Sequence, residues 1–140
     1  MSKLMFALSV VAGLGIAGTC AAQMDAPATS SPSMSREAYS AAKRSADAQY
    51  ELDRDACHSL SDNAKEICAA QAKGKEKVAK ADAEAAYENT PRARHNARVA
   101  RAQAQYEVSM ERCGDFAGHS KDVCRADANA ELVRAKADAS

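Results

Sequence analysis

Residues 46–83 read ADAQYELDRDACHSLSDNAKEICAAQAKGKEKVAKADA, and residues 102–139 read AQAQYEVSMERCGDFAGHSKDVCRADANAELVRAKADA. The two segments align without a gap at a constant offset of 56 residues, and 15 of the 38 aligned positions are identical. Alanine identities carry little weight in so alanine-rich a chain. The Gln-Tyr-Glu block, the shared lysine (Lys65 and Lys121) and both pairs of cysteines carry more. The chain therefore contains an internal duplication.

Each repeat has the pattern of a helix, a tight turn and a second helix. Ala, Lys, Arg, Glu and Gln, which favour helices, dominate the chain from residue 36 onward. Turn-forming residues cluster at 58–62 and 115–119, and Asn89-Thr90-Pro91 separates the repeats. We expect helices at about 36–57, 63–88, 91–113 and 120–137.

Five residues are predicted to define the helix ends. Thr90 is a good N-cap, and Pro91 suits the first position of the helix that follows. Asn63 stands three residues before Glu66, as in a capping box. We also expect Gly114 to adopt the left-handed conformation after the third helix, and Ser120 to cap the fourth.

The four cysteines beyond the N-terminal segment occupy matching places in the two repeats. Cys57 and Cys113 end the first helix of each repeat, and Cys68 and Cys124 lie in the first turns of the second. In an antiparallel hairpin these positions face each other at the roughly 5.5–6 Å Cα separation that a disulfide requires. We therefore predict the disulfides Cys57–Cys68 and Cys113–Cys124, each stabilising its hairpin by about 3 kcal/mol.

A metal or redox site is the alternative use of these cysteines, because His58 follows Cys57 and His119 lies shortly before Cys124. Structural zinc favours cysteines separated by about two to four residues, and thioredoxin-type or haem chemistry needs Cys-x-x-Cys. Neither spacing occurs. We expect structural disulfides, with no metal and no cofactor, and His58, His95 and His119 in turns or exposed.

The composition restricts the fold class. The chain of 140 residues has 19 basic and 19 acidic residues and no Trp, and from Gln23 onward only ten residues are Leu, Ile, Val or Phe. This excludes a Rossmann sheet, a TIM barrel and a sandwich, which need a large aliphatic core. We expect an all-α protein of two tandem, disulfide-stapled antiparallel helical hairpins (four helices), forming an elongated or loose bundle.

Small and apolar residues recur at helical spacing and predict the packed faces. One stripe lies on the third helix, and a second, of small residues, lies on the return helix of each repeat. The residues are Val99, Ala102, Tyr106, Met110 and Cys113; then Ile67, Ala70, Gly74, Val78, Ala81 and Ala85; then Val123, Ala126, Ala130 and Ala137. We expect Tyr50 and Tyr106 to cover the seam of their hairpins.

The N-terminus predicts export. A lysine at position 3 precedes an apolar run at 4–18 and small residues at 19–22, which is the order of a secretory signal peptide. The run is shorter than the roughly 20 residues of a membrane span. A lipid anchor at Cys20 is the alternative, but Ala17-Gly18-Thr19 matches the lipoprotein signal poorly.

These patterns divide the chain into four parts. We expect a signal peptide at 1–22, a flexible Ser/Pro-rich linker at 23–35, and hairpin repeats at 36–90 and 91–140. The mature chain is expected to lack a membrane span and to reside in the periplasm.

Two short basic runs, at 73–80 and 92–101, have acidic residues nearby, so we interpret them as solvated helix faces. Contact with phosphate or lipid headgroups is the alternative. An export signal and a near-zero net charge argue against a nucleic-acid partner. The sequence contains no Ser-His-Asp constellation, paired-carboxylate cleft or glycine-rich phosphate loop, and we expect no enzyme activity.

With these residues in view, the chain resembles a group of small uncharacterised Ala/Lys-rich periplasmic proteins of Gram-negative bacteria. Their repeats carry a Tyr, a Cys, a short turn with Leu, a Lys and a second Cys. Here the pattern is Tyr50, Cys57, Leu60, Lys65 and Cys68, and then Tyr106, Cys113, Phe116, Lys121 and Cys124, with Phe116 departing from it. Such proteins are sometimes labelled TolA-like on composition. The resemblance implies an envelope location and no activity.

The leading functional hypothesis is a non-enzymatic periplasmic protein that acts in the cell envelope as an interaction or stress-related factor. Its partner would be an envelope protein, peptidoglycan or a membrane surface. The alternative is a module that binds a small ligand or a metal through its histidines and tyrosine faces.

Overall fold

The computed structural model describes residues 33–140, and these residues form four α-helices and no strand. The helices are α1 (Arg36–Ala56), α2 (Asp62–Glu88), α3 (Pro91–Arg112) and α4 (Gly118–Asp138), with the 3-10 turns η1 (Cys57–Ser59) and η2 (Cys113–Asp115) after α1 and α3. The all-α fold of two tandem stapled hairpins is confirmed. The expected signal peptide and most of the expected linker lie outside the described residues.

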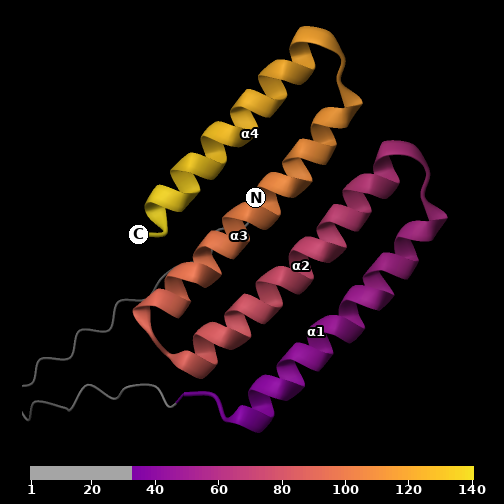
Figure 1. Cartoon of the computed structure of the whole chain (residues 1–140). Helices are drawn as coiled ribbons and strands as arrows, with labels where there is room; N and C mark the ends of the chain where they lie inside the picture. The colour runs from indigo at the N-terminus through magenta and orange to yellow at the C-terminus, as the bar shows by residue number, and fades with distance from the viewer. Residues whose placement is uncertain (1–32) are drawn as a thin grey trace, which may run out of the picture. The chain divides into compact units, whose positions relative to one another are not determined.

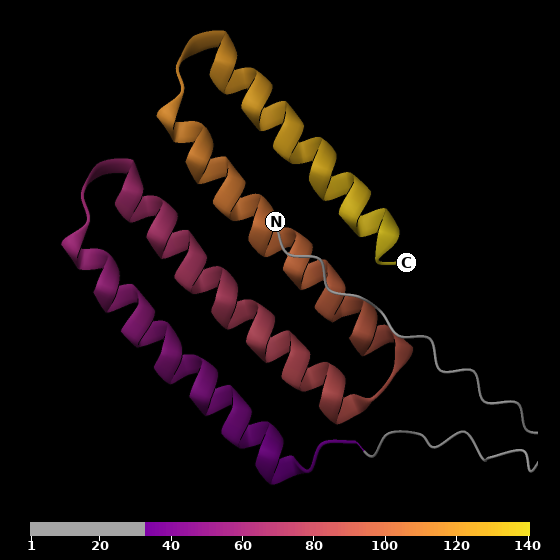
Figure 2. The ribbon, with the colours of Figure 1, turned by 180° about the vertical axis from the view of Figure 1, so that it is seen from behind.

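The four helices of this unit pack side by side in chain order. Within residues 33–140, extensive helix–helix contacts join α1 to α2, α2 to α3 and α3 to α4. Figure 1 shows α1 and α4 at opposite edges with α2 and α3 between them, and Figure 2 shows the same order from behind. The helices therefore form an open layer with two broad faces and two edges, one edge being α1 and the other α4.

Alanine and cystine fill the seams of this layer. The buried residues of the described chain are Ala46, Cys57, Ala72, Gly74, Ala83, Ala93, Ala97, Ala102, Ala104, Cys113, Ala128 and Ala139. Small side chains let helix axes come close, and a Cβ built on Gly74 would lie 3.1 Å from the Cβ of Ala104. Stability therefore depends on close contact along the seams rather than on a large aliphatic core.

The large apolar side chains, by contrast, are often on the surface. Of the ten Leu, Ile, Val and Phe residues from Gln23 onward, five are exposed: Leu52, Leu60, Phe116, Val123 and Val133. A core built from alanine does not use them. They gather at the hairpin turns and on the two edge helices, α1 and α4.

The seam between the repeats is the most extensive of the three. The sequence predicts little apolar area for packing one hairpin on the other, yet α2 and α3 contact each other along much of their length. Gly74 lies against Ala104, so the small-residue stripe of α2 faces the second repeat. Two ion pairs cross the same seam, Lys77–Glu107 at 2.7 Å and Arg101–Asp82 at 2.6 Å.

The break between the repeats follows the sequence prediction. The Thr90 hydroxyl accepts a hydrogen bond from the Ala93 amide at 3.1 Å, and Pro91 is the first residue of α3. Asn89 ends α2 in the left-handed conformation with φ of 50°. Thr90 is therefore confirmed as the cap of α3.

Three other end predictions are wrong. The N-cap of α2 is Ser61, so Asn63 lies inside the helix and forms no capping box with Glu66. The N-cap of α4 is Ala117, and Ser120 is likewise inside its helix. Gly114 belongs to η2, and Gly118, with φ of 55°, takes the left-handed conformation, as Asp62 does at the equivalent position with φ of 51°. The left-handed residue therefore begins the second helix of each hairpin instead of ending the first.

None of the helices in residues 33–140 combines the length and the apolar character that crossing a membrane requires.

Candidate functional site

Both hairpin turns lie at the same end of the layer (Figure 1), here called the turn end and comprising residues 57–61 and 113–117. The predicted disulfides are present there. Cys57–Cys68 and Cys113–Cys124 each have a Cα separation of 5.6 Å across 11 residues of sequence. Cys57 and Cys113 are 2% and 0% exposed. Each turn is therefore held by a buried covalent link to the helix that follows it.

Asn63 joins the two turns. Its side-chain Nδ2 donates one hydrogen bond to the Glu111 carbonyl and another to Asp115 Oδ1, both at 2.8 Å. The approach is so close that a Cβ on Gly114 would lie 2.7 Å from Asn63 Oδ1. A side chain at Gly114 would therefore displace the Asn63 amide, whereas the backbone conformation of Gly114 does not itself call for glycine.

The repeat equivalents of the residues in the Asn63 bridge differ from the bridge residues themselves. At the offset of 56, His119 replaces Asn63 and His58 replaces Gly114. The sequence reasoning missed this bridge and assigned both residues to helix ends. The difference between the repeats at these two positions is the signal that could have revealed it.

Leu60 and Phe116 project large apolar surface from the turn end. They occupy equivalent positions of the two repeats and are 42% and 50% exposed. A groove between α3 and α4 begins at Phe116, and Val123 also lines it. Charged and hydroxyl side chains surround the apolar part: Ser109, Arg112, Ser120, Asp127 and Glu131. An apolar centre with a mixed-charge rim is the composition of a protein interaction surface.

The histidines are placed apart from one another. His58 is on the first turn, with Nε2 4.0 Å from Asp55, and His119 is exposed in the first turn of α4. His95 Nδ1 lies 2.8 Å from the Ala139 carbonyl, where Arg98 also donates to that carbonyl. Among residues 33–140, no group of three or more His, Cys, Asp or Glu is arranged to hold a metal ion.

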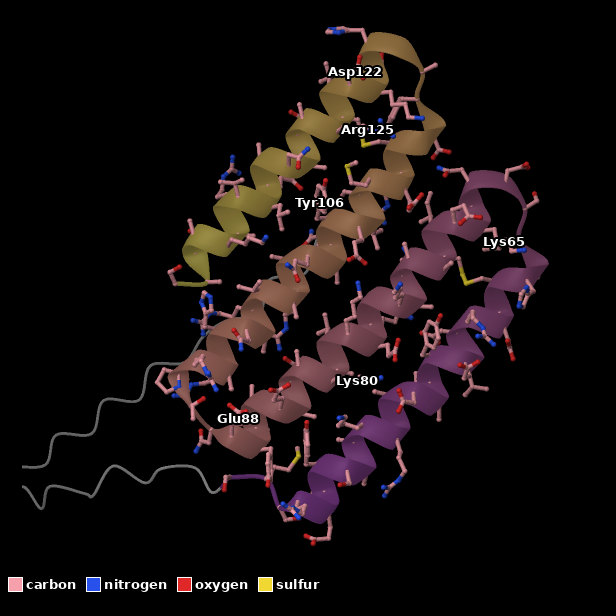
Figure 3. All side chains as sticks on the ribbon, in the orientation of Figure 1. Lys65, Lys80, Glu88, Tyr106, Asp122 and Arg125 are labelled. Atoms are coloured by element: carbon pink, nitrogen blue, oxygen red, sulfur yellow. A yellow bond between two sulfur atoms is a disulfide. The ribbon has the colours of Figure 1, made fainter. Side chains whose placement is uncertain are left out.

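The tyrosines lie along the seams. Tyr50 is half-buried beside Ala46 and Ala72, with the Arg54 guanidinium 5.8 Å from its ring centroid. Tyr106 is half-buried near Ala128 and Leu132, between α3 and α4 (Figure 3). At the end opposite the turns, the rings of Tyr39 and Tyr87 stack with centroids 4.7 Å apart, which ties α1 to α2. These rings serve packing between helices.

Three lysines of the 73–80 run, Lys75, Lys77 and Lys80, are paired with carboxylates. Lys80 lies between α1 and α2 (Figure 3) and contacts Asp47 at 2.5 Å and Glu76 at 2.6 Å. The hydrogen bonds to these two carboxylates raise the pKa of Lys80 to about 12, and the bond from Lys80 lowers the pKa of Asp47. Asp53 also has a lowered pKa, because Lys75 and then Gln49 donate to it.

Lys75, Lys77 and Lys80 therefore contact carboxylates along the seams of the layer. The turn end combines exposed apolar side chains, a groove and two turns held by disulfides. No protein-family model matches this chain, and no curated protein and no solved structure matches it either.

Proposed function

We propose that the protein is a non-enzymatic interaction protein of the cell envelope, exported to the periplasm, which binds another envelope protein through its turn end. The observation that carries the proposal is the pair of exposed apolar side chains, Leu60 and Phe116, on two stapled turns.

The compartment follows from the disulfides. Two disulfides in a chain of this size indicate an oxidising environment, because cytosolic thiols are kept reduced. The order of charged, apolar and small residues at the N-terminus supports export into such a compartment. The resemblance to periplasmic repeat proteins points to the same place.

Exposed apolar side chains are common on proteins, but here two of them stand at equivalent positions of the two repeats. The chain has very few large apolar residues, and at the turn end one stands at the same position of each repeat. The staples and the Asn63 bridge hold both turns before any partner arrives. A preorganised surface loses little conformational entropy on binding, so even a small apolar area can give useful affinity.

The surroundings favour a protein as the partner. The rim of the groove carries Arg112, Asp127 and Glu131, so it offers both signs of charge. A lipid headgroup surface would be met by clustered cations, and here Lys75, Lys77 and Lys80 of α2 contact carboxylates. An apolar centre with a mixed rim fits a second protein better than peptidoglycan or a membrane.

Photocrosslinking in living cells tests the proposal. A photoreactive amino acid is placed at Leu60, at Phe116 and, as a matched exposed control, at Gln103 on α3. We expect Leu60 and Phe116 to crosslink to the same envelope protein and Gln103 not to do so. The substitutions Leu60→Asp and Phe116→Asp should then each reduce co-purification of that protein at least tenfold while the circular dichroism spectrum is unchanged.

Two results would contradict the proposal. One is equal crosslinking from all three positions, which would show that the turn end has no preference. The other is co-purification of the partner that survives both aspartate substitutions. Native mass spectrometry of the protein isolated from the same cells separates the ligand-binding alternative, because a retained small molecule or metal would add to the mass of the oxidised chain.

A further inference from the structure

The central seam of the layer joins α2 to α3. The repeat equivalents of these two helices are α4 and α1, which form the two edges of the layer. Gly74 of α2 and Ala104 of α3 meet in this seam, and both are buried, as is Ala97. At the offset of 56, Gly74 corresponds to Ala130 of α4, and Ala104 corresponds to Ala48 of α1. Both of these equivalents are exposed.

One edge stripe runs along α4 and consists of Ala126, Ala130, Val133 and Ala137. The spacings of four, three and four residues place them on one side of the helix, opposite Ala128, which is buried against α3. All four are exposed, and Val133, at 69%, is the most exposed large apolar residue of the described chain. The stripe contains no charged residue.

The other edge stripe runs along α1 and consists of Ala41, Ser45, Ala48 and Leu52. It has the same spacing, and all four residues are exposed, with Leu52 at 66%. It lies away from Ala46 and Cys57, which are buried toward α2. Each of its members is the repeat equivalent of an α3 residue, in order Ala97, Arg101, Ala104 and Val108.

We propose that the α4 edge stripe of one copy of this chain binds the α1 edge stripe of a second copy, in the register that joins α2 to α3 within the chain. In that register Ala130 lies against Ala48, as Gly74 lies against Ala104. Leu52 then covers Ala126, and Val133 covers Ser45. The contact adds α1 of the second copy to the layer, next to α4, in the position that α3 occupies next to α2.

Neither ion pair of the central seam is repeated in this register. Within the chain, Lys77 of α2 pairs with Glu107 of α3 at 2.7 Å. The equivalent of Glu107 is Glu51 on α1, and the equivalent of Lys77 is Val133, so the cation is lost at that position. The equivalents of the other pair, Arg101 and Asp82, are Ser45 and Asp138, so the cation is lost there as well. The contact between copies therefore has apolar area at Val133 where the central seam has an ion pair.

The contact between copies is weaker than the seam within the chain. Asn63 needs a glycine opposite it, and in the contact between copies His119 and His58 take the places of Asn63 and Gly114. The hydrogen-bonded bridge at the turn end is therefore not repeated. We expect reversible association with a dissociation constant between about 1 μM and about 1 mM. Because the two stripes differ, the contact is head-to-tail and can extend beyond a dimer.

Sedimentation equilibrium of the oxidised chain, alone and in mixtures, tests the contact. Ala130→Glu blocks the α4 stripe, and Ala48→Glu blocks the α1 stripe. Gln103→Glu adds the same charge at an exposed position outside both stripes and serves as the matched control. The average mass of the wild type and of Gln103→Glu should rise with concentration beyond twice that of one chain, and each blocked variant should stay a monomer.

The mixture of the two blocked variants gives the sharpest result. Each variant keeps one intact stripe, and the two intact stripes are complementary, so the mixture should form dimers and nothing larger. A wild type that remains monomeric at about 1 mM would overturn the proposal. A single blocked variant that still dimerises would also overturn it, because that requires a contact between like edges. Unchanged circular dichroism verifies that each variant is folded. The turn end is intact in both variants, so loss of association would leave partner crosslinking at Phe116 unchanged.

Discussion

Asn63 uses both protons of its side-chain amide to hold the second repeat, one on the Glu111 carbonyl and one on Asp115. A hydrogen bond of this kind contributes roughly 1 kcal/mol to the free energy of unfolding. The residue that permits the contact is Gly114, since any side chain there would enter the space of the amide. The two positions therefore act as one unit.

The first prediction concerns this pair. Asn63→Ala and Gly114→Ala should each lower the free energy of unfolding by about 1 kcal/mol, measured by urea denaturation. The double variant should lose less than the sum, because either substitution alone breaks the same bridge. His58→Ala, at the repeat equivalent of Gly114, is the matched control and should change the free energy little.

The sign of the Gly114 effect gives a stricter test. In the Asn63→Ala background the amide is gone, and Gly114→Ala should become neutral or slightly stabilising, because alanine restricts the unfolded chain. A loss of the same size in both backgrounds would show that Gly114 matters for some reason other than Asn63.

The second prediction concerns acid. Asp47 and Asp53 have pKa values below their usual range because Lys80 and Lys75 donate to them. A carboxyl whose folded pKa is lowered adds stability above its unfolded pKa, about 3.9, and this stability is lost as the pH falls through the folded value. Both pairs are exposed to solvent, so each contributes little, and we expect a modest fall of the melting temperature below about pH 4.

Asp47→Asn identifies the source of this acid sensitivity. The variant should melt lower than the wild type at neutral pH and should lose less on acidification, because one titrating pair is absent. Asp122→Asn, on an exposed part of α4, is the control and should follow the wild type. Parallel melting curves for wild type and Asp47→Asn from pH 6 to pH 2 would contradict the assignment.

At the residue scale, the sequence predicts features that depend on neighbours along the chain. Thr90, Pro91 and the cysteine pairs could be predicted because a cap involves residues about three positions apart and each hairpin disulfide joins residues only 11 positions apart. The Asn63 bridge spans 48 and 52 residues, so helix-capping rules assigned Asn63 to the wrong role. Likewise, Gly114 has the usual sequence position of a C-terminal glycine, but its actual constraint comes from a helix of the other repeat.

The helices show how the two repeats depend on each other. α2 is bounded on one side by α1 and on the other by α3, and its small residues serve both seams, Ala72 and Ala83 toward α1 and Gly74 toward α3. The sequence stripes predicted packed faces on both return helices. The stripe of α2 is packed, but the predicted stripe of α4 (Val123, Ala126, Ala130 and Ala137) is exposed, so that prediction is wrong. The stripes could not show which neighbouring helix each one contacts. A helix inside a layer has two apolar sides, and the periodicity of the sequence does not indicate which side faces which neighbour.

The third prediction concerns the staples. Replacing Cys57 and Cys68 together by Ser should cost about 3 kcal/mol of unfolding free energy, in keeping with the closure of a loop of this length. Because α2 also packs on α3, hydrogen exchange should accelerate in α3 as well as in α1 and α2. The corresponding change at Cys113 and Cys124 should cost about the same and should affect α4 most.

Exchange rates also show whether the repeats fold separately. If the Cys57 and Cys68 variant loses protection in α1 and α2 while α3 keeps wild-type rates, the seam between the repeats contributes little, contrary to its extent in the structure. Protection lost together in α1, α2 and α3 would show that the layer unfolds as a coupled unit.

At the scale of the whole described unit, alanine seams lead to an open layer. Closing four helices into a bundle requires each helix to present a wide apolar stripe to a shared core, usually of Leu, Ile, Val and Phe. This chain has ten such residues from Gln23 onward, and half of them are exposed. Pairwise alanine seams join neighbours well but supply nothing to fill a central space, so α1 and α4 stay on opposite edges (Figure 2). Because the layer is open, the outer sides of α1 and α4 contact no other helix of the described chain.

The last prediction tests this shape in solution. A compact globule of residues 35–140 would have a radius of gyration near 13 Å. Helices of 21 to 27 residues are about 32–40 Å long, and four of them spaced about 9 Å apart in one layer give a radius of about 15 Å. Small-angle scattering on a chain starting at Ser35 should give the larger value and a flat-particle profile.

That measurement needs a monomer, because head-to-tail association would also raise the radius. The Ala130→Glu variant, which blocks one edge, supplies it at the concentrations that scattering requires. The closed bundle predicts about 13 Å for this variant, since a buried core would be unaffected by a charge on its outer surface. A radius near 15 Å that is the same for Ala130→Glu and Ala48→Glu would show that the layer stays open without a second copy to cover its edges.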